Sequence, residues 1–522
     1  MSDKAPTFDE RSAEFYTVLA VIAFNVLTTV WFIVLNNKPL SWDPALHMLY
    51  SYVYYKLLTM FNFGALVHVS NYYPPFFHLT AAFMYILFGF SEKIAVATNI
   101  LYYFLLVFAV YKTATEVWDR RAGYFSVMLI SGYPLLVIME RKFMIDFAFT
   151  AMVALTVYFF VKSRGLRDLR YSALFGLSFG LTTLTKWNAF VYILPFALAD
   201  LYFEYSENIR DVKNALGNVS VAAAVAFVSA AWWYLPNLFV VFKRLEYFAS
   251  IGGKEGDPTF WTLKGWLYYL KDLDASVGIV FMLTFLAAVV WFAYRRKVSK
   301  KMDRYVKAML FSLLTTYVIL TFLSNKDHRY ILPLLPYVAW ISGVFLRDVS
   351  EELSGKLGLK KVVFTVLISL VVLVQLSAVS FAVPNLHNSY LLSSDRPESQ
   401  NWHINDILNT IAKYARPGDV VITLADHPYL NGQSLDFYRV IHGYDFRVFN
   451  GVYLPVNAVV KNFNKINFVI VIEPREHKGV YGKAEALLYK AFYQHKDSFE
   501  LIGEFHLPDN STAYIYMNRA CH

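Results

Sequence analysis

The sequence predicts a multi-span α-helical membrane protein with a small α/β domain at its C-terminal end. Long apolar runs recur between about residues 15 and 383. Of all residues, 57% are hydrophobic and only 17% are charged, whereas soluble domains average about 25% charged residues. From residue 385 the composition changes to that of a soluble domain. We therefore expect a transmembrane module over residues 1–384 and a soluble domain over residues 385–522.

The apolar runs give about eleven transmembrane helices, because each is long enough to cross a bilayer. The first runs from about Phe15 to Leu35. The other expected spans are 93–111, 122–139, 144–162, 171–185, 188–203, 217–239, 277–294, 306–323, 329–346 and 361–383. Two aromatic segments, 48–63 and 76–90, are expected to form interfacial helices, the second with a re-entrant loop as an alternative.

Lys and Arg residues predict the orientation of the spans, because cytoplasmic loops of membrane proteins are enriched in them. Alternate loops hold Lys112, Arg120, Arg121, Lys162, Arg164, Arg167, Arg170, Arg210, Lys213, Arg295, Arg296, Lys297, Lys300, Lys301, Arg304, Lys307, Lys356, Lys360 and Lys361. We expect a multi-pass protein of the cell membrane with a cytoplasmic N-terminus and an extracytoplasmic C-terminal domain. The net charge of +9 then reflects membrane orientation, and no nucleic-acid partner is expected.

The soluble domain alternates strand-like and helix-like segments, which is typical of a small α/β layer. The expected strands are 419–424, 467–472, 499–505 and 513–517, and the expected helices are 403–414 and 483–495. Asp426, His427 and Pro428 follow a strand end, where α/β sheets bind ligands. We favour the simpler reading that Asp426 starts a turn or a helix.

Asp43 lies in the segment NNKPLSWDPALH, residues 36–47, just after the first span. A carboxylate at a membrane exit is close to lipid headgroups, where a general base for a membrane-borne substrate would have to lie. The alternative is that Asp43 caps a helix that starts at Pro44. By itself this short segment favours the capping role.

Two further outer turns carry charges next to the apolar runs, where charges are costly and usually paired or functional. The first holds Glu140, Arg141, Lys142 and Asp146, of which Asp146 is too short to extend its charge to the interface. The second holds Lys326, Asp327, His328 and Arg329, where Arg and Lys suit phosphate binding. Lys186 lies in another tight outer turn. Interfacial anchoring is the alternative for the basic residues.

Metal-binding signals are sparse. His47, His68 and His78 lack a paired metal-ligand spacing, and Cys521 is the single cysteine. Asp272 and Asp274 form a D-x-D pair, which can hold a divalent cation but is common by chance. We therefore expect no certain cofactor and no metal ligand among the candidate site residues.

Together these segments resemble the GT-C superfamily of membrane glycosyltransferases. The chain is most similar to the branch of protein O-mannosyltransferases and aminoarabinose transferases, over roughly residues 15–345. The segments that carry the resemblance are SWDPALH, the double proline in YYPPF, RKFMIDFAFTAMVAL, GLSFGLTTLTKWNAFVYILP and NKDHRYILPLLP.

The resemblance implies inverting transfer of a sugar from a polyprenyl-phosphate carrier to a protein, lipid or glycan acceptor at the outer membrane face. It gives Asp43 the general-base position and Asp146 the second catalytic acidic position. It also implies that Lys326 and Arg329 contact the phosphate, with Lys186 and His328 beside them. Glu140 and Tyr73 are then supporting residues. Many relatives carry a second acid where this chain has Pro44, and Lys or His where it has Tyr73. No WWDYG-type motif is present, which argues against an oligosaccharyltransferase.

Two other function classes stay open from the sequence. A transporter or lipid-carrier flippase would explain the many spans, but it predicts inverted halves with charges at mid-membrane. A non-catalytic assembly or sensor subunit would bind through its outer domain. Because the charges collect at one expected face and a soluble outer domain follows, we favour the glycosyltransferase.

Overall fold

The computed structural model describes residues 10–206, 212–251, 256–271, 273–299, 303–357, 360–381 and 396–520. The chain divides into two compact units. The first comprises Met1–Val34 and Asn62–Arg396, and the second comprises Leu35–Phe61 and Pro397–His522. These units are defined by packing rather than by membrane position, so the predicted division between residues 384 and 385 stays a prediction.

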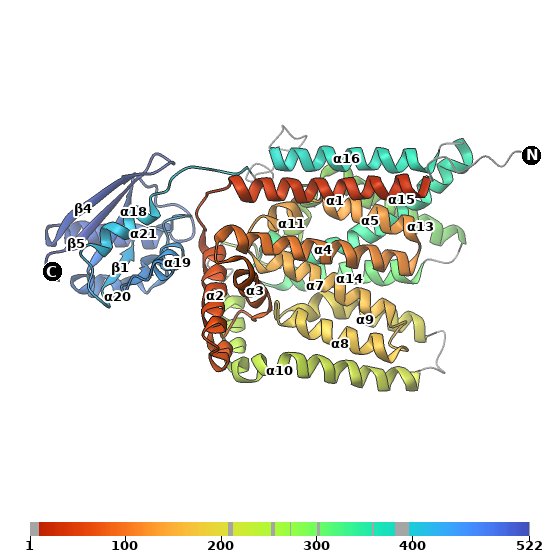
Figure 1. The fold of residues 1–522 in the computed structure, drawn as a ribbon, viewed down its shortest axis with the longest axis horizontal. Coiled ribbons are helices and arrows are strands. Elements are labelled where there is room, and N and C mark those ends of the chain that lie inside the picture. The colour runs from red at the N-terminus through yellow and green to blue at the C-terminus, as the bar shows by residue number, and fades with distance from the viewer. Residues whose placement is uncertain are drawn as a thin grey trace, which may run out of the picture. The chain divides into compact units, whose positions relative to one another are not determined.

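The first unit is a bundle of helices that run side by side (Figure 1). Its elements are α1 (Glu10–Leu35), η1 (Phe63–His68), α3 (Phe76–Phe88), α4 (Glu92–Val117), α5 (Arg120–Gly132), α6 (Pro134–Glu140), α7 (Ile145–Lys162), α8 (Leu169–Thr183), α9 (Ala189–Tyr205), α10 (Val212–Ile251), α11 (Leu263–Lys271), α12 (Leu273–Val277), α13 (Ile279–Ser299), α14 (Arg304–Phe322), η3 (His328–Leu334), α15 (Leu335–Leu357) and α16 (Lys361–Phe381). The predicted multi-span helical architecture is confirmed.

The predicted count of eleven spans is not confirmed. Among the described residues, eight helices are long and apolar enough to cross a membrane, or nine if α5 and α6, which meet at 64°, form one span. Helices α8 and α9 form where spans were predicted, but they contain only 15 and 17 residues. The expected interfacial helix after the double proline is α3, whose 13 residues are too short to cross a bilayer.

Small residues let helices of this unit approach closely, as is common in membrane bundles. A Cβ atom added at Gly176 of α8 would lie 2.2 Å from the carbonyl oxygen of Ala222 in α10. One added at Gly180, one turn later, would lie 2.7 Å from the carbonyl oxygen of Ala226. The Gly-x-x-x-Gly spacing of α8 therefore fixes its contact with α10.

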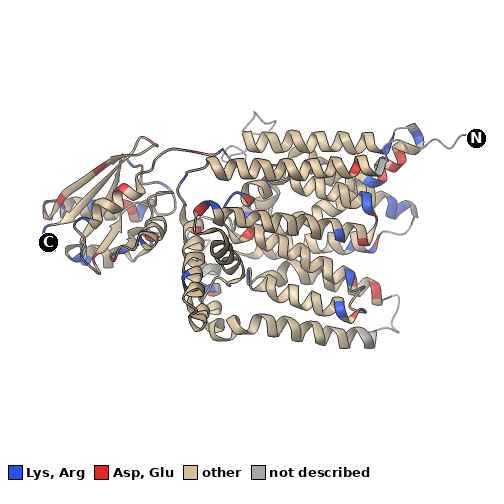
Figure 2. Cartoon of the chain, in the orientation of Figure 1, with Lys and Arg blue, Asp and Glu red and all other residues tan. Residues whose placement is uncertain are grey.

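Lys and Arg gather at the end of the bundle where α1 begins (Figure 2). This end carries the loop after α7, the end of α9 and the start of α14, as the sequence predicted for the cytoplasmic face. Because positive charge marks cytoplasmic loops, the opposite end of the bundle is the candidate outer face.

The second unit is an α/β domain that also includes the helix α2. Its five-stranded sheet has the order β2-β1-β3-β5-β4. Strands β2, β1 and β3 are parallel, and β5 runs antiparallel to both of its neighbours, β3 and β4. Its elements are α2 (Trp42–Thr59), α18 (Ile404–Ala412), β1 (Val420–Thr423), α19 (Gly432–His442), β2 (Arg447–Asn450), η4 (Gly451–Tyr453), α20 (Val456–Lys461), η5 (Phe463–Lys465), β3 (Phe468–Glu473), α21 (Gly482–Gln494), η6 (Lys496–Ser498), β4 (Phe499–His506) and β5 (Thr512–Asn518). The predicted α/β class is confirmed, and α2 packs against α19.

Candidate functional site

A buried cluster of opposite charges lies within the first unit. Lys186 donates from Nζ to Asp146 Oδ1 at 2.7 Å, and Arg329 places Nη1 3.9 Å from Asp146 Oδ2. Asp146 is only 3% exposed. The structure thus brings together three predicted site residues from three different turns.

The local structure of each turn explains how these side chains meet. Asp146 lies in the first turn of α7, after Met144 in extended conformation. Lys186 follows α8, whose last turn is continued by a hydrogen bond from the Lys186 N–H to the Thr182 carbonyl oxygen at 3.0 Å. Arg329 is the second residue of η3, which Asp327 caps by accepting from the Arg329 N–H at 2.9 Å. The cluster therefore depends on one helix start, one helix end and one cap.

Asp327 fixes the orientation of the Arg329 guanidinium. Nε of Arg329 donates to Asp327 Oδ2 at 2.8 Å, and its Nη2 approaches the same oxygen at 2.6 Å. Burial acts to raise the pKa of Asp327, but the charge and hydrogen bonds of Arg329 outweigh it and hold that pKa below its usual range. Asp327 is therefore ionised at neutral pH, and Arg329 is held by a charged partner.

The aromatic ring of Tyr330 covers the other cation. Nζ of Lys186 lies 5.1 Å from the centre of that ring. The carbonyl oxygen of Tyr330 accepts from the Tyr192 hydroxyl at 2.9 Å, which ties η3 to α9. An ammonium over a ring face gains a cation–π attraction when it is partly removed from water. Lys186 and Arg329 are thus two cations fixed on one buried carboxylate.

Lys326 lies in the same turn but is used differently. Its Nζ donates to the carbonyl oxygens of Thr321 at 2.6 Å and Leu323 at 2.7 Å, and the side chain is 5% exposed. Burial lowers the pKa of Lys326, and nearby Asp257 partly offsets that effect. A cation at a helix C-terminus satisfies carbonyl groups and the helix dipole. These contacts favour a structural role for Lys326, and its predicted phosphate contact stays untested.

Replacing Lys326 with Met should lower the free energy of unfolding by about 1–3 kcal/mol, because carbonyl groups at the end of α14 lose their donor. Thermal unfolding of the full chain in detergent measures this change. Lys356→Met is the matched control, since that ammonium is 72% exposed and its loss should be nearly neutral. Unchanged stability together with weaker donor binding in Lys326→Met would instead assign the ammonium to the donor.

The remaining predicted residues of the first unit make other contacts. His328 stacks on Tyr268, with ring centres 4.8 Å apart and planes at 14°. Glu140 is buried at the end of α6, and its carbonyl oxygen accepts from Asn99 Nδ2 at 2.9 Å. The Tyr73 N–H donates to Ser70 Oγ at 2.9 Å. Their predicted roles stay predictions.

Asp43 belongs to the second unit, where it is half-buried in the first turn of α2. The helix begins at Trp42, and Ser41 rather than Asp43 is its N-cap residue. The alternative that Asp43 caps a helix starting at Pro44 is therefore wrong. The helix starts at Trp42, and its N-cap residue, Ser41, lies two positions before Asp43. Asp43 and the Asp146 cluster lie in different units, so their meeting at one site stays a prediction.

An apolar groove of about 600 Å³ runs between α9 and α14. Its lining includes Phe190, Leu194 and Leu198 of α9 and Phe311 and Ile319 of α14. Phe190 is 48% exposed and Leu198 is 61% exposed, although both are large and apolar. The end at Phe190 is four residues from Lys186 along the chain. The groove therefore starts beside the loop that carries one cation of the cluster.

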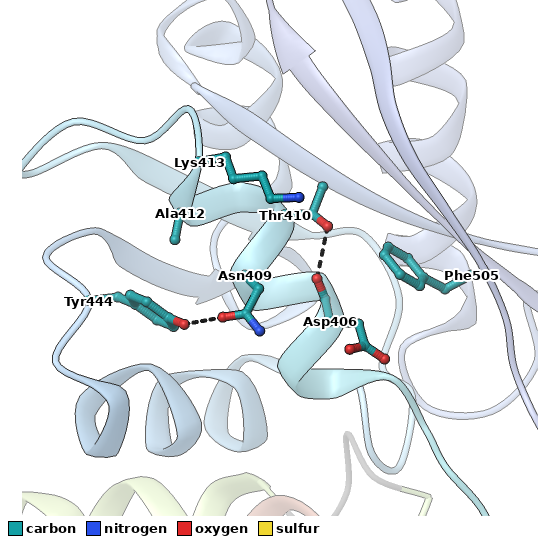
Figure 3. A pocket seen from close by; sticks show the side chains of 7 residues that line it. All are labelled: Asp406, Asn409, Thr410, Ala412, Lys413, Tyr444 and Phe505. Atoms are coloured by element: carbon teal, nitrogen blue, oxygen red, sulfur yellow. Dashed lines mark hydrogen bonds between the residues drawn. The ribbon is translucent and has the colours of Figure 1, made fainter.

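The second unit has an open hollow of about 700 Å³ over α18, drawn in Figure 3. Its polar side chains bond within it: the Tyr444 hydroxyl donates to Asn409, and Thr410 Oγ1 donates to the Asp406 carbonyl oxygen at 2.8 Å. Asp406 also pairs with His403 Nδ1 at 2.7 Å. None of the residues that line this hollow was a predicted site residue.

The described part of the chain contains no group of three His, Cys, Asp or Glu side chains that could hold a metal ion. Of the D-x-D pair, Asp272 lies outside the described residues. Asp274 is in α12, where its Oδ1 accepts from the Ala275 N–H at 2.9 Å. The described residues therefore add no further ligand to the D-x-D pair that the sequence suggested for a divalent cation.

Comparisons with known proteins bear on this arrangement. The family model described as dolichyl-phosphate-mannose-protein mannosyltransferase matches residues 73–234. This range holds Tyr73, Glu140, Asp146 and Lys186. A search of the curated proteins finds no match.

Solved structures share the fold over almost the whole chain. ArnT from Cupriavidus metallidurans bound to undecaprenyl phosphate matches with a TM-score of 0.60 and 12% identity, over 95% of this chain and 97% of that chain. The chain has the GT-C glycosyltransferase fold. The Archaeoglobus fulgidus oligosaccharyltransferase in complex with Zn and sulfate matches with a TM-score of 0.61 and 16% identity, over 95% and 72% of the two chains.

The GT-C fold that the resemblance predicted is therefore confirmed, and the partial family match agrees with the predicted glycosyltransferase class. A third GT-C structure, the arabinofuranosyltransferase AftD from Mycobacteria, matches with a TM-score of 0.55 and 13% identity. This chain covers only 40% of AftD. Because one of these neighbours is an oligosaccharyltransferase and another is an arabinofuranosyltransferase, they do not identify the sugar donor of this chain.

Sequence reasoning missed two features of this cluster, the cap formed by Asp327 and the pairing of Lys186 with Asp146. Asp327 was named only as part of a charged turn, although its position two residues before Arg329 is a local signal for a cap. The pairing of Lys186 with Asp146 joins residues 40 positions apart and has no local signal.

Proposed function

We propose that this chain is an inverting glycosyltransferase that moves a sugar from a polyprenyl-phosphate carrier to an acceptor hydroxyl at the outer membrane face. Asp43 acts as the general base, and Lys186 and Arg329 bind the leaving phosphate. The observation that carries the proposal is the convergence of Lys186 and Arg329 on buried Asp146. An ion pair at the candidate outer end of a membrane bundle is costly unless it is used or well satisfied.

The apolar groove between α9 and α14 supports a lipid donor. It extends along α9 from Phe190 to Phe203, a rise of about 20 Å at 1.5 Å per residue. The hydrocarbon of one leaflet is about 15 Å thick, half of the bilayer core. We assign the groove to the isoprenoid tail, because it starts beside Lys186, where the anionic headgroup would be neutralised.

The proposed reaction is a single displacement at the anomeric carbon. The carboxylate of Asp43 takes the proton of the acceptor hydroxyl, whose oxygen forms the new bond to that carbon. The bond between the carbon and the phosphate oxygen breaks on the opposite face, which inverts the configuration. Both electrons of that bond leave with the polyprenyl phosphate, whose growing negative charge Lys186 and Arg329 stabilise.

Asp146 has a supporting role in this proposal. Its two carboxylate oxygens face the two cations, so it holds them apart and aims them at a common point. A phosphate that enters between Lys186 and Arg329 takes over part of the contact that the two cations make with Asp146, and no buried charge is then left without a partner. The cost of binding is then low, because the cations are already ordered.

Turnover of defined donors by the full chain in proteoliposomes tests the proposal. The probes are dolichyl-phosphate mannose and other polyprenyl-phosphate monosaccharides, with nucleotide-linked mannose as the control and a membrane extract as the acceptor source. We expect mass spectrometry to show release of polyprenyl phosphate from at least one lipid donor and no use of the nucleotide sugar. Movement of a lipid donor between leaflets without cleavage would favour the flippase instead.

A further inference from the structure

The start of α2 lies on the carboxyl ends of the parallel strands of the second unit. Asp426 follows β1, Asn450 ends β2 and Arg475 follows β3. The indole of Trp42 donates from Nε1 to Asp426 Oδ1 at 2.8 Å. Trp42 is the residue directly before Asp43.

Asp426 is the centre of this contact. The same Oδ1 atom also accepts from the Tyr453 hydroxyl at 2.9 Å and lies 3.4 Å from Asn450 Nδ2. Burial raises the pKa of Tyr453, and the negative charges of Asp426 and Asp43 raise it further. Tyr453 therefore stays protonated and donates to Asp426 at any physiological pH. Both carboxylates therefore act on the same hydroxyl group.

A second layer of bonds holds Asp426 in place. Its N–H donates to Glu485 Oε1 at 2.8 Å, and its carbonyl oxygen accepts from Arg475 Nη2 at 2.8 Å. Arg475 also forms two bonds of 2.9 Å to the buried Glu485 carboxylate. Burial acts to raise the pKa of Glu485, but the hydrogen bonds from Arg475 and Asp426 hold it below its usual value. The main chain of Asp426 is thus fixed by a buried ion pair.

The segment that leads to Asp43 is held at further points by the same domain. Ser434 Oγ donates to the Leu40 carbonyl oxygen at 2.6 Å. The Asn37 N–H donates to the Glu398 carbonyl oxygen at 2.7 Å, and Lys38 pairs with the Glu398 carboxylate at 2.5 Å. These contacts fix the backbone before Trp42, and the Trp42 bond fixes the first turn of α2.

The place where Trp42 docks is one where α/β sheets bind ligands. From β1 the chain passes to β2 on one side, and from β2 it crosses back to β3 on the other side. The carboxyl ends of β1 and β3 therefore lie at a change of direction in the sheet, which forms a crevice in such folds. Here the side chain of Trp42, from the first turn of α2, occupies this position.

We propose that Asp426 is a positioning residue for the general base: through Trp42 it fixes the first turn of α2 and with it the carboxylate of Asp43. This inference rests on the proposed function, which makes Asp43 the base. It gives the C-terminal domain a role in catalysis that does not require a ligand of its own. A base displaced by 1 Å can lose about 100-fold in rate, so a single hydrogen bond to the neighbouring residue matters.

The test compares Trp42→Phe, Asp426→Ala and Asp426→Asn in the full chain, with the lipid donor that the wild-type enzyme consumes. Trp42→Phe and Asp426→Ala should lower kcat about 10-fold to 100-fold with little change in the KM for the donor, because neither residue contacts the phosphate. Asp426→Asn keeps an oxygen that can accept from Trp42 and should retain most of the activity. Loss of activity in Asp426→Asn equal to that of Asp43→Asn would overturn the positioning role, since Asp426 would then act through its charge.

Hydrogen exchange of the full chain in detergent gives a second readout that needs no substrate. In Asp426→Ala, amides of residues 36–47 should exchange about tenfold faster, as expected for loss of one hydrogen bond to a charged group, while β1 and β3 stay protected. Faster exchange throughout the sheet would show a merely structural role and overturn the proposal.

Trp118→Phe is the matched control, because it also removes an indole bond to a carboxylate, here to Asp303 at 3.2 Å in the first unit. It should leave kcat unchanged. Full activity of Trp42→Phe and Asp426→Ala beside an inactive Asp43→Asn would refute this inference alone. Full activity of Asp43→Asn would refute the proposed base and the positioning role with it, and the two failures are thereby distinguished.

Discussion

Replacing Asp43 with Asn should lower kcat about 1,000-fold, within the range of roughly 10²–10⁴ that general acid–base catalysis contributes. The amide keeps the shape of the side chain but cannot take the acceptor proton. Binding of the lipid donor should change little, because the phosphate is assigned to Lys186 and Arg329. Initial rates of polyprenyl phosphate release, normalised to the amount of folded protein, measure the effect.

Asp445→Asn is the control for this substitution. It makes the same chemical change at an exposed position before β2, at the amino end of the strands and away from Trp42. Its kcat should equal that of the wild-type protein. Full transfer by Asp43→Asn would exclude Asp43 as the base, and loss of lipid movement without a glycosylation defect would favour the flippase.

The pattern of apolar runs predicted most helices because burial in lipid demands long apolar segments whatever their partners are. It counted α8 and α9 as spans; both form where they were predicted, but they hold only 15 and 17 residues, at or below the shortest usual length of about 17 residues for a membrane crossing. Strand β2 was missed because its four residues, Arg447–Asn450, form an edge strand that is too short for a visible pattern. Local sequence patterns thus predict long helices and strands more reliably than short ones.

Contacts between distant residues could not be predicted in the same way. Trp42 and Asp426 are 384 residues apart, and each has an ordinary local explanation, an interfacial aromatic and a turn aspartate. The same holds for Asp146 and Lys186, which a sequence presents as two separate charges near the membrane. Lys326 is the opposite case: a lysine four residues past Phe322 could have been recognised as a cap for the end of α14.

Replacing Lys186 or Arg329 with Met should each lower kcat/KM about 100-fold, the lower end of the cost of removing one donor from a developing oxyanion. Arg329→Lys should fall between the wild-type protein and Arg329→Met, because it keeps the charge but loses the planar fork that Asp327 orients. The double variant should lose less than the product of the single losses, since both cations share Asp146.

Binding of polyprenyl phosphate separates this role from a structural one. If the two cations hold the phosphate, the Kd for the product should rise in both Met variants in parallel with the loss of kcat/KM. Arg295→Met removes a 54% exposed arginine paired with Asp348 at the basic end of the bundle and should change neither quantity. Normal product binding by folded Lys186→Met and Arg329→Met would show that the cluster is only a buried ion pair and does not bind the phosphate. Lower thermal stability would then be the main effect of those variants, since removing one partner leaves Asp146 with an incompletely compensated charge.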